Sequence, residues 1–142
     1  MQTESFRVLA LSPEKDSTKV GLFRDEILIF QKNIQHDSEK LEGYPYIGMQ
    51  HIYRSEAILE ELDKEGINMS RFHAVCGTGG LLRPLKGGTY QVNDAMIRDL
   101  LEGYGGHHVS NLGGLIAFDI AEGLNIPAFI TDPFVVDELL PV

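Results

Sequence analysis

Apolar residues fall into three short runs near the start of the chain. The first, residues 6–11, is rich in strand-forming side chains and stops at the turn signal Ser12-Pro13. Residues 18–23 and 27–30 form the next two runs, with a charged stretch between them. The pattern predicts three consecutive antiparallel strands, of which the first two form a hairpin.

The apolar spacing changes to a helical period after Gly48. Apolar residues then return to one face every 3.6 positions, and Gly66 supplies a stop signal. Asn93 is a suitable N-cap for a shorter helix that continues through Leu101. The first of these two predicted helices presents the stripe Met49, Ile52, Tyr53, Leu59 and Leu62.

A third helical stripe starts near Ser110 or Asn111 and ends around Gly123. Residues 72–76 and 126–130 have strand character. Three antiparallel strands followed by alternating helices and strands predict a mixed α/β sheet that is covered by helices. The third stripe consists of Leu112, Leu115, Ile116, Ile120 and Leu124.

The length of 142 residues leaves room for one domain with a real core. We find no internal repeat, linker or low-complexity segment. The sequence stops at Val142, soon after the last predicted strand and without the helix that usually covers such a strand. We therefore expect an edge or face of the sheet to be left bare.

The amino-acid composition indicates the cellular compartment and excludes some classes of binding partner. Cys76 is the single cysteine, so it cannot form an internal disulfide, and we expect a small buried apolar residue in a reducing cytoplasm. The net charge of -9 disfavours nucleic acid. No apolar run approaches the roughly 20 residues that cross a bilayer, and the start lacks a secretory signal. These features predict a soluble cytoplasmic protein without a membrane partner.

Candidate chemistry gathers where the predicted strands end. Such loops converge in one cleft in α/β sheets, where backbone N–H groups favour a phosphate or carboxylate ligand. The candidate residues are Ser12 to Lys19, Gly77 to Gly80, Thr131 and Asp132, together with His107 and His108 before a helix start.

Each candidate also has a simpler interpretation. Ser17-Thr18-Lys19 suits an ordinary turn before a strand, and Asp132 before Pro133 is a common turn pair. The glycines of Gly77-Thr78-Gly79-Gly80 provide permissive backbone, and no Walker lysine follows them. Adjacent histidines such as His107 and His108 rarely bind one ion, so we predict no metal site there.

Four ordered motifs carry a family resemblance. They are Gly79-Gly80-Leu81-Leu82-Arg83-Pro84-Leu85, Gly87-Gly88-Thr89-Tyr90, His108-Val109-Ser110-Asn111-Leu112-Gly113, and the stretch from Ile126 to Leu139. In order, spacing and identity the chain closely resembles the butyrate kinases and related branched-chain carboxylate kinases.

The resemblance implies a ribonuclease H-like fold of the acetate and sugar kinase, Hsp70 and actin superfamily, with residues 1–142 forming only the amino-terminal lobe. The nucleotide-binding carboxyl-terminal lobe would be absent. Such enzymes transfer a phosphoryl group between ATP and a short-chain carboxylate, giving an acyl phosphate, with Mg²⁺ as counter-ion. Catalysis in this chemistry consists mainly of positioned cations and hydrogen-bond donors.

The resemblance also implies roles for individual residues. Asp132 would act near the metal and the transferred phosphoryl group, and His108 would donate to its oxygens. Ser110 and Asn111 would begin the helix beneath them. The substrate side would comprise Thr78, Gly79, Gly80 and Asn111, and the phosphate loop would comprise Ser12, Ser17, Thr18 and Lys19.

Two departures from the family pattern fall on this site. Butyrate kinases carry a first loop of the form Asn-Pro-Gly-Ser-Thr-Ser-Thr-Lys, whereas residues 12–19 here are Ser-Pro-Glu-Lys-Asp-Ser-Thr-Lys. Glu14 adds a side chain and a negative charge where backbone should approach phosphate. Thr78 replaces an arginine fork, a loss that costs about a hundredfold to a thousandfold in comparable transition-state clamps.

Three hypotheses follow. The first is a truncated butyrate kinase-like lobe with little or no kinase activity by itself. The second is a non-catalytic binding or assembly module that pairs with another chain or with its own copy. The third is an enzyme assembled from two chains, which requires a separate carboxyl-terminal lobe.

Overall fold

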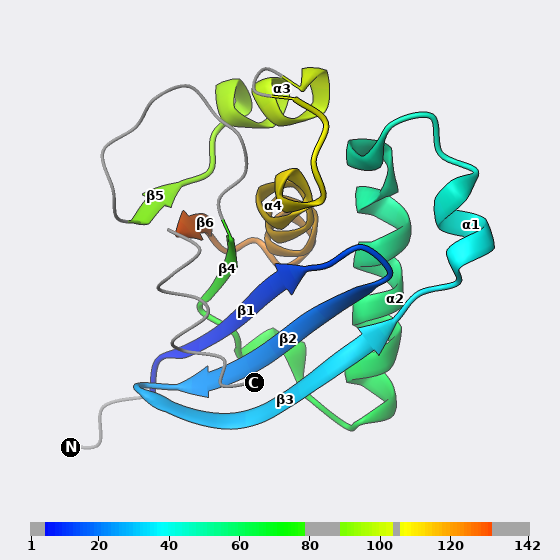
Figure 1. Ribbon diagram of the computed structural model, residues 1–142. Helices are drawn as coiled ribbons and strands as arrows, with labels where there is room; N and C mark the ends of the chain where they lie inside the picture. Colours follow the sequence, from blue (N-terminus) through cyan, green and yellow to red (C-terminus); the bar gives the residue numbers. More distant parts are fainter. Residues whose placement is uncertain (1–4, 79–88, 104–105, 132–142) are drawn as a thin grey trace.

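The computed structural model describes residues 5–78, 89–103 and 106–131, which form one sheet with helices packed on it (Figure 1). The order of the strands in the sheet is β3-β2-β1-β4-β6-β5. The strands are β1 (Arg7–Pro13), β2 (Ser17–Arg24), β3 (Ile27–Gln35), β4 (Ala74–Thr78), β5 (Thr89–Gln91) and β6 (Ala128–Thr131).

Strand directions confirm the predicted mixed sheet. β1, β2 and β3 are antiparallel neighbours, whereas β1 pairs with β4 and β4 with β6 in parallel. The short β5 adds an antiparallel edge beside β6 that the sequence pattern did not predict. The parallel pairs place the carboxyl ends of β1, β4 and β6 at one edge of the sheet.

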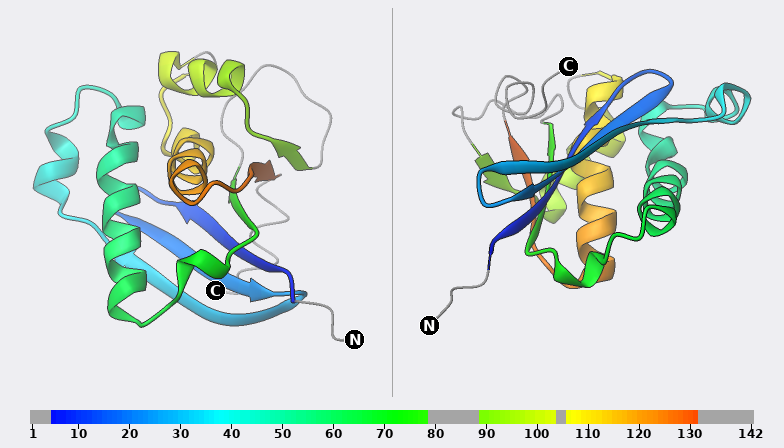
Figure 2. Two further views of the ribbon diagram at one scale, coloured as in Figure 1. Left: turned by 180° about the vertical axis from the view of Figure 1, so that it is seen from behind. Right: turned by 90° about the horizontal axis from the view of Figure 1, so that it is seen from below.

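Helices α2 and α4 lie side by side on one face of the sheet, as the two views of Figure 2 show. α4 packs on β4 and β6, and α3 packs on α4. The helices are α1 (Ser38–Glu42), α2 (His51–Lys64), α3 (Asp94–Glu102) and α4 (Leu112–Leu124), with short 3-10 turns η1 (Ile47–Gln50), η2 (Met69–Arg71) and η3 (Val109–Asn111).

The core lies between the helices and the sheet. Apolar side chains from β1 and β2 meet the buried faces of α2 and α4, and burial of this apolar area is the main stabilising contribution. Its fully buried members include Leu9, Leu11, Val20, Ile58, Leu112 and Ile116.

A polar contact joins the two packed helices. Asp119 Oδ2 of α4 lies 2.6 Å from His51 Nδ1 of α2 and accepts a hydrogen bond from Ser55 Oγ at 3.0 Å. Lys32 of β3 pairs with Glu61 of α2 and with Glu65, the residue that follows this helix. These contacts fix α2 between the sheet edge and α4.

Two predicted helices are confirmed at their ends. The Asn93 side chain caps α3 by accepting a hydrogen bond from Met96 N at 2.9 Å. α4 starts directly after Asn111 and stops at Asn125, whose φ of 57° is the left-handed conformation of a C-cap. The Asn93 cap is therefore confirmed, whereas Asn111 makes no side-chain capping hydrogen bond at the start of α4.

The predicted face of α2 is wrong at its amino-terminal end. Met49 and Ile52 are 48% and 57% exposed, respectively. The buried face is Arg54, Ser55, Ile58 and Leu62 instead. Arg54, Ile58 and Leu62 recur every four residues. Because the first of them is a charged residue, the apolar pattern does not identify this face.

Other sequence predictions are corrected in detail. Ser12 and Pro13 belong to β1 rather than to a turn, because they pair with Lys19 and Thr18. Cys76 is half-buried rather than fully buried. None of the helices in the described ranges has the length and apolar content to cross a bilayer. The expected bare face depends on residues 132–142, which lie outside the described ranges.

Candidate functional site

The carboxyl ends of three strands define the candidate site, which we call the carboxyl edge. Leu11 of β1 is opposite Gly77 of β4, and Thr78 is opposite Thr131 of β6. Ser12 follows Leu11 in β1 and therefore reaches the same edge. The structure thus brings together Ser12, Gly77, Thr78 and Thr131, four of the residues that the sequence pattern predicted to converge.

The first turn of α4 packs directly against this edge because two glycines face each other. A Cβ on Gly77 would lie 2.1 Å from Gly113 O, and a Cβ on Gly113 would lie 2.1 Å from Thr78 O. No side chain fits such a gap. The glycines hold the start of α4 beside Thr78.

Hydroxyl groups line the described part of the carboxyl edge. Thr78 and Thr131 are each only 6% exposed. Burial raises the pKa of the neighbouring Cys76 thiol, and the nearby Thr131 side chain partly opposes that effect. Cys76 is therefore held as a neutral thiol, which is a poor nucleophile.

Asn111 and His108 occupy the segment that leads into α4. Asn111 is 1% exposed, and its Nδ2 donates to Gly106 O at 2.9 Å, which ties the preceding loop to η3. His108 is exposed and precedes η3, and its carbonyl accepts from Asn111 N at 3.0 Å. His107 stacks on Tyr46 with ring centroids 4.6 Å apart.

The β1–β2 turn forms one wall of the site. Glu14 N donates to Ser17 O at 2.8 Å and closes the turn. Ser17 and Thr18, both predicted phosphate-loop residues, are buried. Lys19 is partly exposed, but its Nζ lies 3.5 Å from Glu14 Oε1. The cation predicted to meet phosphate therefore has an acidic partner within the same loop.

Arg54 of α2 is the residue that the sequence patterns missed. Its side chain is 0% exposed, and it inserts behind the β1–β2 turn. The guanidinium donates to the carbonyls of Glu14, Lys15 and Ser17, to Thr18 Oγ1 and to Gln50 Oε1, at distances from 2.7 to 3.2 Å.

Burial lowers the pKa of Arg54 to about 10, while the nearby Asp16 opposes that shift. Arg54 therefore remains a cation at neutral pH. Its contact with Thr18 extends to His36, whose Nε2 lies 2.8 Å from Thr18 Oγ1. Burial, reinforced by Arg54, lowers the pKa of His36 to about 4, so this imidazole is neutral at pH 7.

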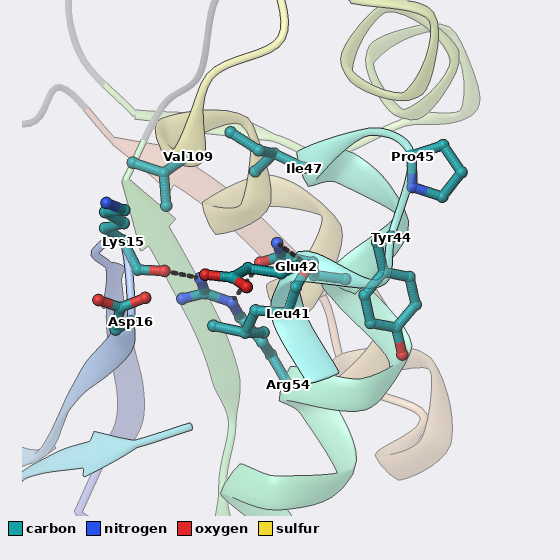
Figure 3. A pocket seen from close by; sticks show the side chains of 10 residues that line it. Lys15, Asp16, Leu41, Glu42, Tyr44, Pro45, Ile47, Arg54 and Val109 are labelled. Atoms are coloured by element: carbon teal, nitrogen blue, oxygen red, sulfur yellow. Dashed lines mark hydrogen bonds between the residues drawn. The ribbon is translucent and has the colours of Figure 1, made fainter. Parts of the chain in front are cut away.

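A pocket of about 260 Å³ opens between the β1–β2 turn, η3 and the segment from α1 to η1 (Figure 3). One end carries charged and polar groups of the turn and of α2, and the other is mostly apolar. Its lining consists of Lys15, Asp16, Leu41, Glu42, Tyr44, Pro45, Ile47, Gln50, Arg54 and Val109. The pocket thus adjoins the turn on the side of α1.

Several predicted residues lie outside the described ranges, namely Gly79, Gly80 and Asp132. Within the described ranges, no three acidic, histidine or cysteine side chains lie close enough to hold a metal ion. The described part of the carboxyl edge offers hydroxyl groups but no carboxylate, so it does not by itself form a magnesium site. We therefore assign no step to Mg²⁺.

No family model matches the chain. Among solved structures, it is similar to an exopolyphosphatase from Cytophaga hutchinsonii, with a TM-score of 0.51 and 9% identity over 91% of this chain and 54% of that one. For a Ppx/GppA family member from Aquifex aeolicus the TM-score is 0.49 and the sequence identity is 14%, over 97% of this chain and 57% of that one. For YeaZ from Pseudomonas aeruginosa the TM-score is 0.46 and the sequence identity is 12%, over 89% of this chain and 44% of that one.

The chain spans about half the length of these solved proteins. The likeness to the Cytophaga structure, together with the strand order, confirms the predicted fold. The described residues have the ribonuclease H-like mixed sheet of the fold found in acetate and sugar kinases, Hsp70 and actin.

Proposed function

We propose that this chain is the amino-terminal lobe of a butyrate kinase-like phosphotransferase and that it makes little or no acyl phosphate by itself. The family reaction transfers a phosphoryl group between ATP and a short-chain carboxylate such as butyrate or isobutyrate. The ordered sequence motifs support this family, and the fold is compatible with it.

One structural observation carries the proposal. The ends of β1, β4 and β6 and the start of α4 meet at the carboxyl edge, with Thr78 and Gly113 in direct backbone contact. Ligands of α/β sheets bind at such edges, near the amino termini of helices. The β1–β2 turn lies beside this edge and would face the phosphate groups.

In this proposal His108 donates to the transferred phosphoryl group and Asp132 acts beside it. Thr78, Gly79, Gly80 and Asn111 would form the substrate side. Thr78 would contribute a neutral hydroxyl where a guanidinium is expected, so less negative charge is neutralised in the transition state.

The state of the β1–β2 turn supports low activity. Ser17 and Thr18 are buried, and Lys19 lies within ion-pair distance of Glu14. A phosphate that approaches this turn meets the carboxylates of Glu14 and Asp16 as well as the lysines. A second lobe would also be needed to close over ATP and Mg²⁺.

Trapping with hydroxylamine tests the proposal. The purified chain is incubated with ATP, Mg²⁺ and butyrate or isobutyrate, and acyl phosphate is captured as the hydroxamate. We expect no product above a control without enzyme. Turnover that persists through extensive purification and is lost in His108→Ala would refute the inactive-lobe proposal, although it would support the family assignment.

A surface feature favours a second function, that of an assembly module. Tyr46, Met49 and Ile52 are each about half exposed and follow one another along η1 and the start of α2. Exposed apolar groups of this kind favour a partner chain or a second copy. Sedimentation at several concentrations tests this, with Ile52→Ser expected to weaken association and Ile27→Ser on β3 as the control.

A further inference from the structure

Arg54 has an unusual set of partners for a buried cation. Buried arginines normally pair with carboxylates. Arg54 instead gives most of its hydrogen bonds to backbone carbonyls of a single turn, those of Glu14, Lys15 and Ser17. The cation is therefore directed at the backbone of the β1–β2 turn.

The carbonyl groups of residues 14–17 all accept hydrogen bonds from the protein. Arg54 binds three of them, and His36 N donates to Asp16 O at 2.9 Å. The turn carbonyls are thus fixed by groups that lie behind the turn, on α2 and at the end of β3.

The turn amides consequently face the opposite way. In a trans peptide unit the N–H of a residue points away from the carbonyl of the residue before it. Because the carbonyls of Glu14 and Lys15 point at Arg54, the N–H groups of Lys15 and Asp16 point away from it. Both residues are exposed, and neither amide donates to a group in the described part of the chain.

The charge of Arg54 strengthens this arrangement. Each peptide unit has a dipole of roughly 3.5 D, and a cation at the carbonyl end stabilises the orientation in which the amide end faces outward. Successive outward amides form a concavity that attracts anions. A positive charge behind the turn also opposes the field of Glu14 and Asp16 at its front.

We propose that Arg54 is a positioning residue that orients the amides of Lys15 and Asp16 toward a bound phosphate group. The inference rests on the proposed function, because it names the donors and the support of the same phosphate loop. In this inference the phosphate is bound by the backbone amides of the turn and not by the buried hydroxyls of Ser17 and Thr18. Arg54 holds the turn carbonyls from behind.

Titration of the ¹⁵N-labelled wild-type chain with inorganic phosphate at constant ionic strength tests the location. We expect saturable shifts of the Lys15 and Asp16 amide resonances. Saturable shifts elsewhere with these two amides unmoved, or no saturable shift at any amide, would overturn the proposal. This experiment needs no variant.

Two variants test the positioning role. Arg54→Met keeps a long apolar side chain but removes the charge and the fork, whereas Arg54→Lys keeps the charge and loses the fork. We expect phosphate affinity to fall at least tenfold in Arg54→Met and to be partly rescued in Arg54→Lys. Arg71→Met, at an exposed arginine of η2, is the matched control and should bind as the wild type does.

Residual dipolar couplings of the Lys15 and Asp16 N–H bonds separate positioning from general stability. We expect these couplings to change in folded Arg54 variants while those of α4 stay constant. Unchanged couplings, or unchanged phosphate affinity in a folded Arg54→Lys, would refute the role even if Arg54→Met fails to fold. Acyl phosphate formation is scored separately, so failure of the proposed function is distinguishable from failure of this inference.

Discussion

Glu14 and Lys19 make opposing contributions at the mouth of the β1–β2 turn. Their side chains are 48% and 26% exposed, and the two charged atoms lie 3.5 Å apart. An exposed pair of this kind contributes only about 0.2–1 kcal/mol to stability. The pair has a larger effect on anionic ligands, because the Glu14 carboxylate neutralises the charge of Lys19 and also repels anions.

Glu14→Gln should therefore tighten phosphate binding. Loss of the carboxylate frees Lys19 and removes a like charge, and an energy of about 0.2–1 kcal/mol corresponds to roughly 1.5- to 5-fold in the dissociation constant. Calorimetry with inorganic phosphate measures it. Glu26→Gln in the β2–β3 turn is the control, since it makes the same change in net charge. Equal tightening in both variants would show that only overall charge matters.

The buried imidazole of His36 predicts an acid-sensitive fold. Its pKa is about 4 in the folded chain, below the ordinary value of 6.5. Between these values the unfolded chain binds a proton that the folded chain does not. The free energy of unfolding should therefore fall as the pH drops from 6.5 to 4, with a contribution of at most about 3 kcal/mol.

Denaturant titrations of the wild type and His36→Gln at several pH values measure this contribution. Glutamine does not titrate, so the difference between the two unfolding free energies should narrow or reverse toward pH 4. Parallel pH profiles for the two chains would show that His36 is not the titrating group.

Helix α4 depends on a glycine only at the end that meets the sheet. A Cβ on Gly113 would press against the Thr78 backbone, whereas one on Gly123 would meet nothing within 4 Å. We expect Gly113→Ala to lower the free energy of unfolding by at least about 2 kcal/mol through overpacking. Gly123→Ala should raise it by roughly 0.5–1 kcal/mol through helix propensity. Thermal unfolding of both variants checks the contrast.

At the level of helices and strands, the sequence predicted the features that depend on local signals such as helix caps and apolar runs. Asn93 caps α3 as expected, and α4 begins at Leu112, directly after Asn111. The end of β3 was missed because its outer half is an edge strand with mostly polar, exposed positions. β5 was missed since a strand of three residues has too little pattern to detect.

The candidate site was only partly predictable for a related reason. Strand ends and glycines identified the carboxyl edge, because parallel strands bring their carboxyl ends together. Arg54 was not predicted, since nothing in its neighbourhood along the chain indicates that a turn forty residues earlier needs donors. Its role depends on the position of α2 beside β3 and the β1–β2 turn, which is tertiary information.

At the scale of the whole molecule, the net charge of -9 sets the long-range field. The charges of the β1–β2 turn itself cancel, because Lys15 and Lys19 balance Glu14 and Asp16, and the buried Arg54 behind the turn adds one positive charge. A phosphate ion at the turn is therefore repelled mainly by acidic groups elsewhere on the chain. Salt screens such distant charges, since the Debye length falls from about 30 Å at 0.01 M to about 10 Å at 0.1 M.

Phosphate binding should consequently strengthen when salt is added over this range, by about twofold, which corresponds to roughly 0.4 kcal/mol of relieved repulsion. Calorimetry in sodium fluoride, a salt whose anion competes weakly, measures the trend. Lys19→Gln removes one local positive charge and should steepen the rise, because less local attraction then offsets the repulsion that salt screens. A steady loss of phosphate affinity with added salt would contradict this prediction. It would mean that attraction by the cations at the turn exceeds repulsion by the distant acidic groups.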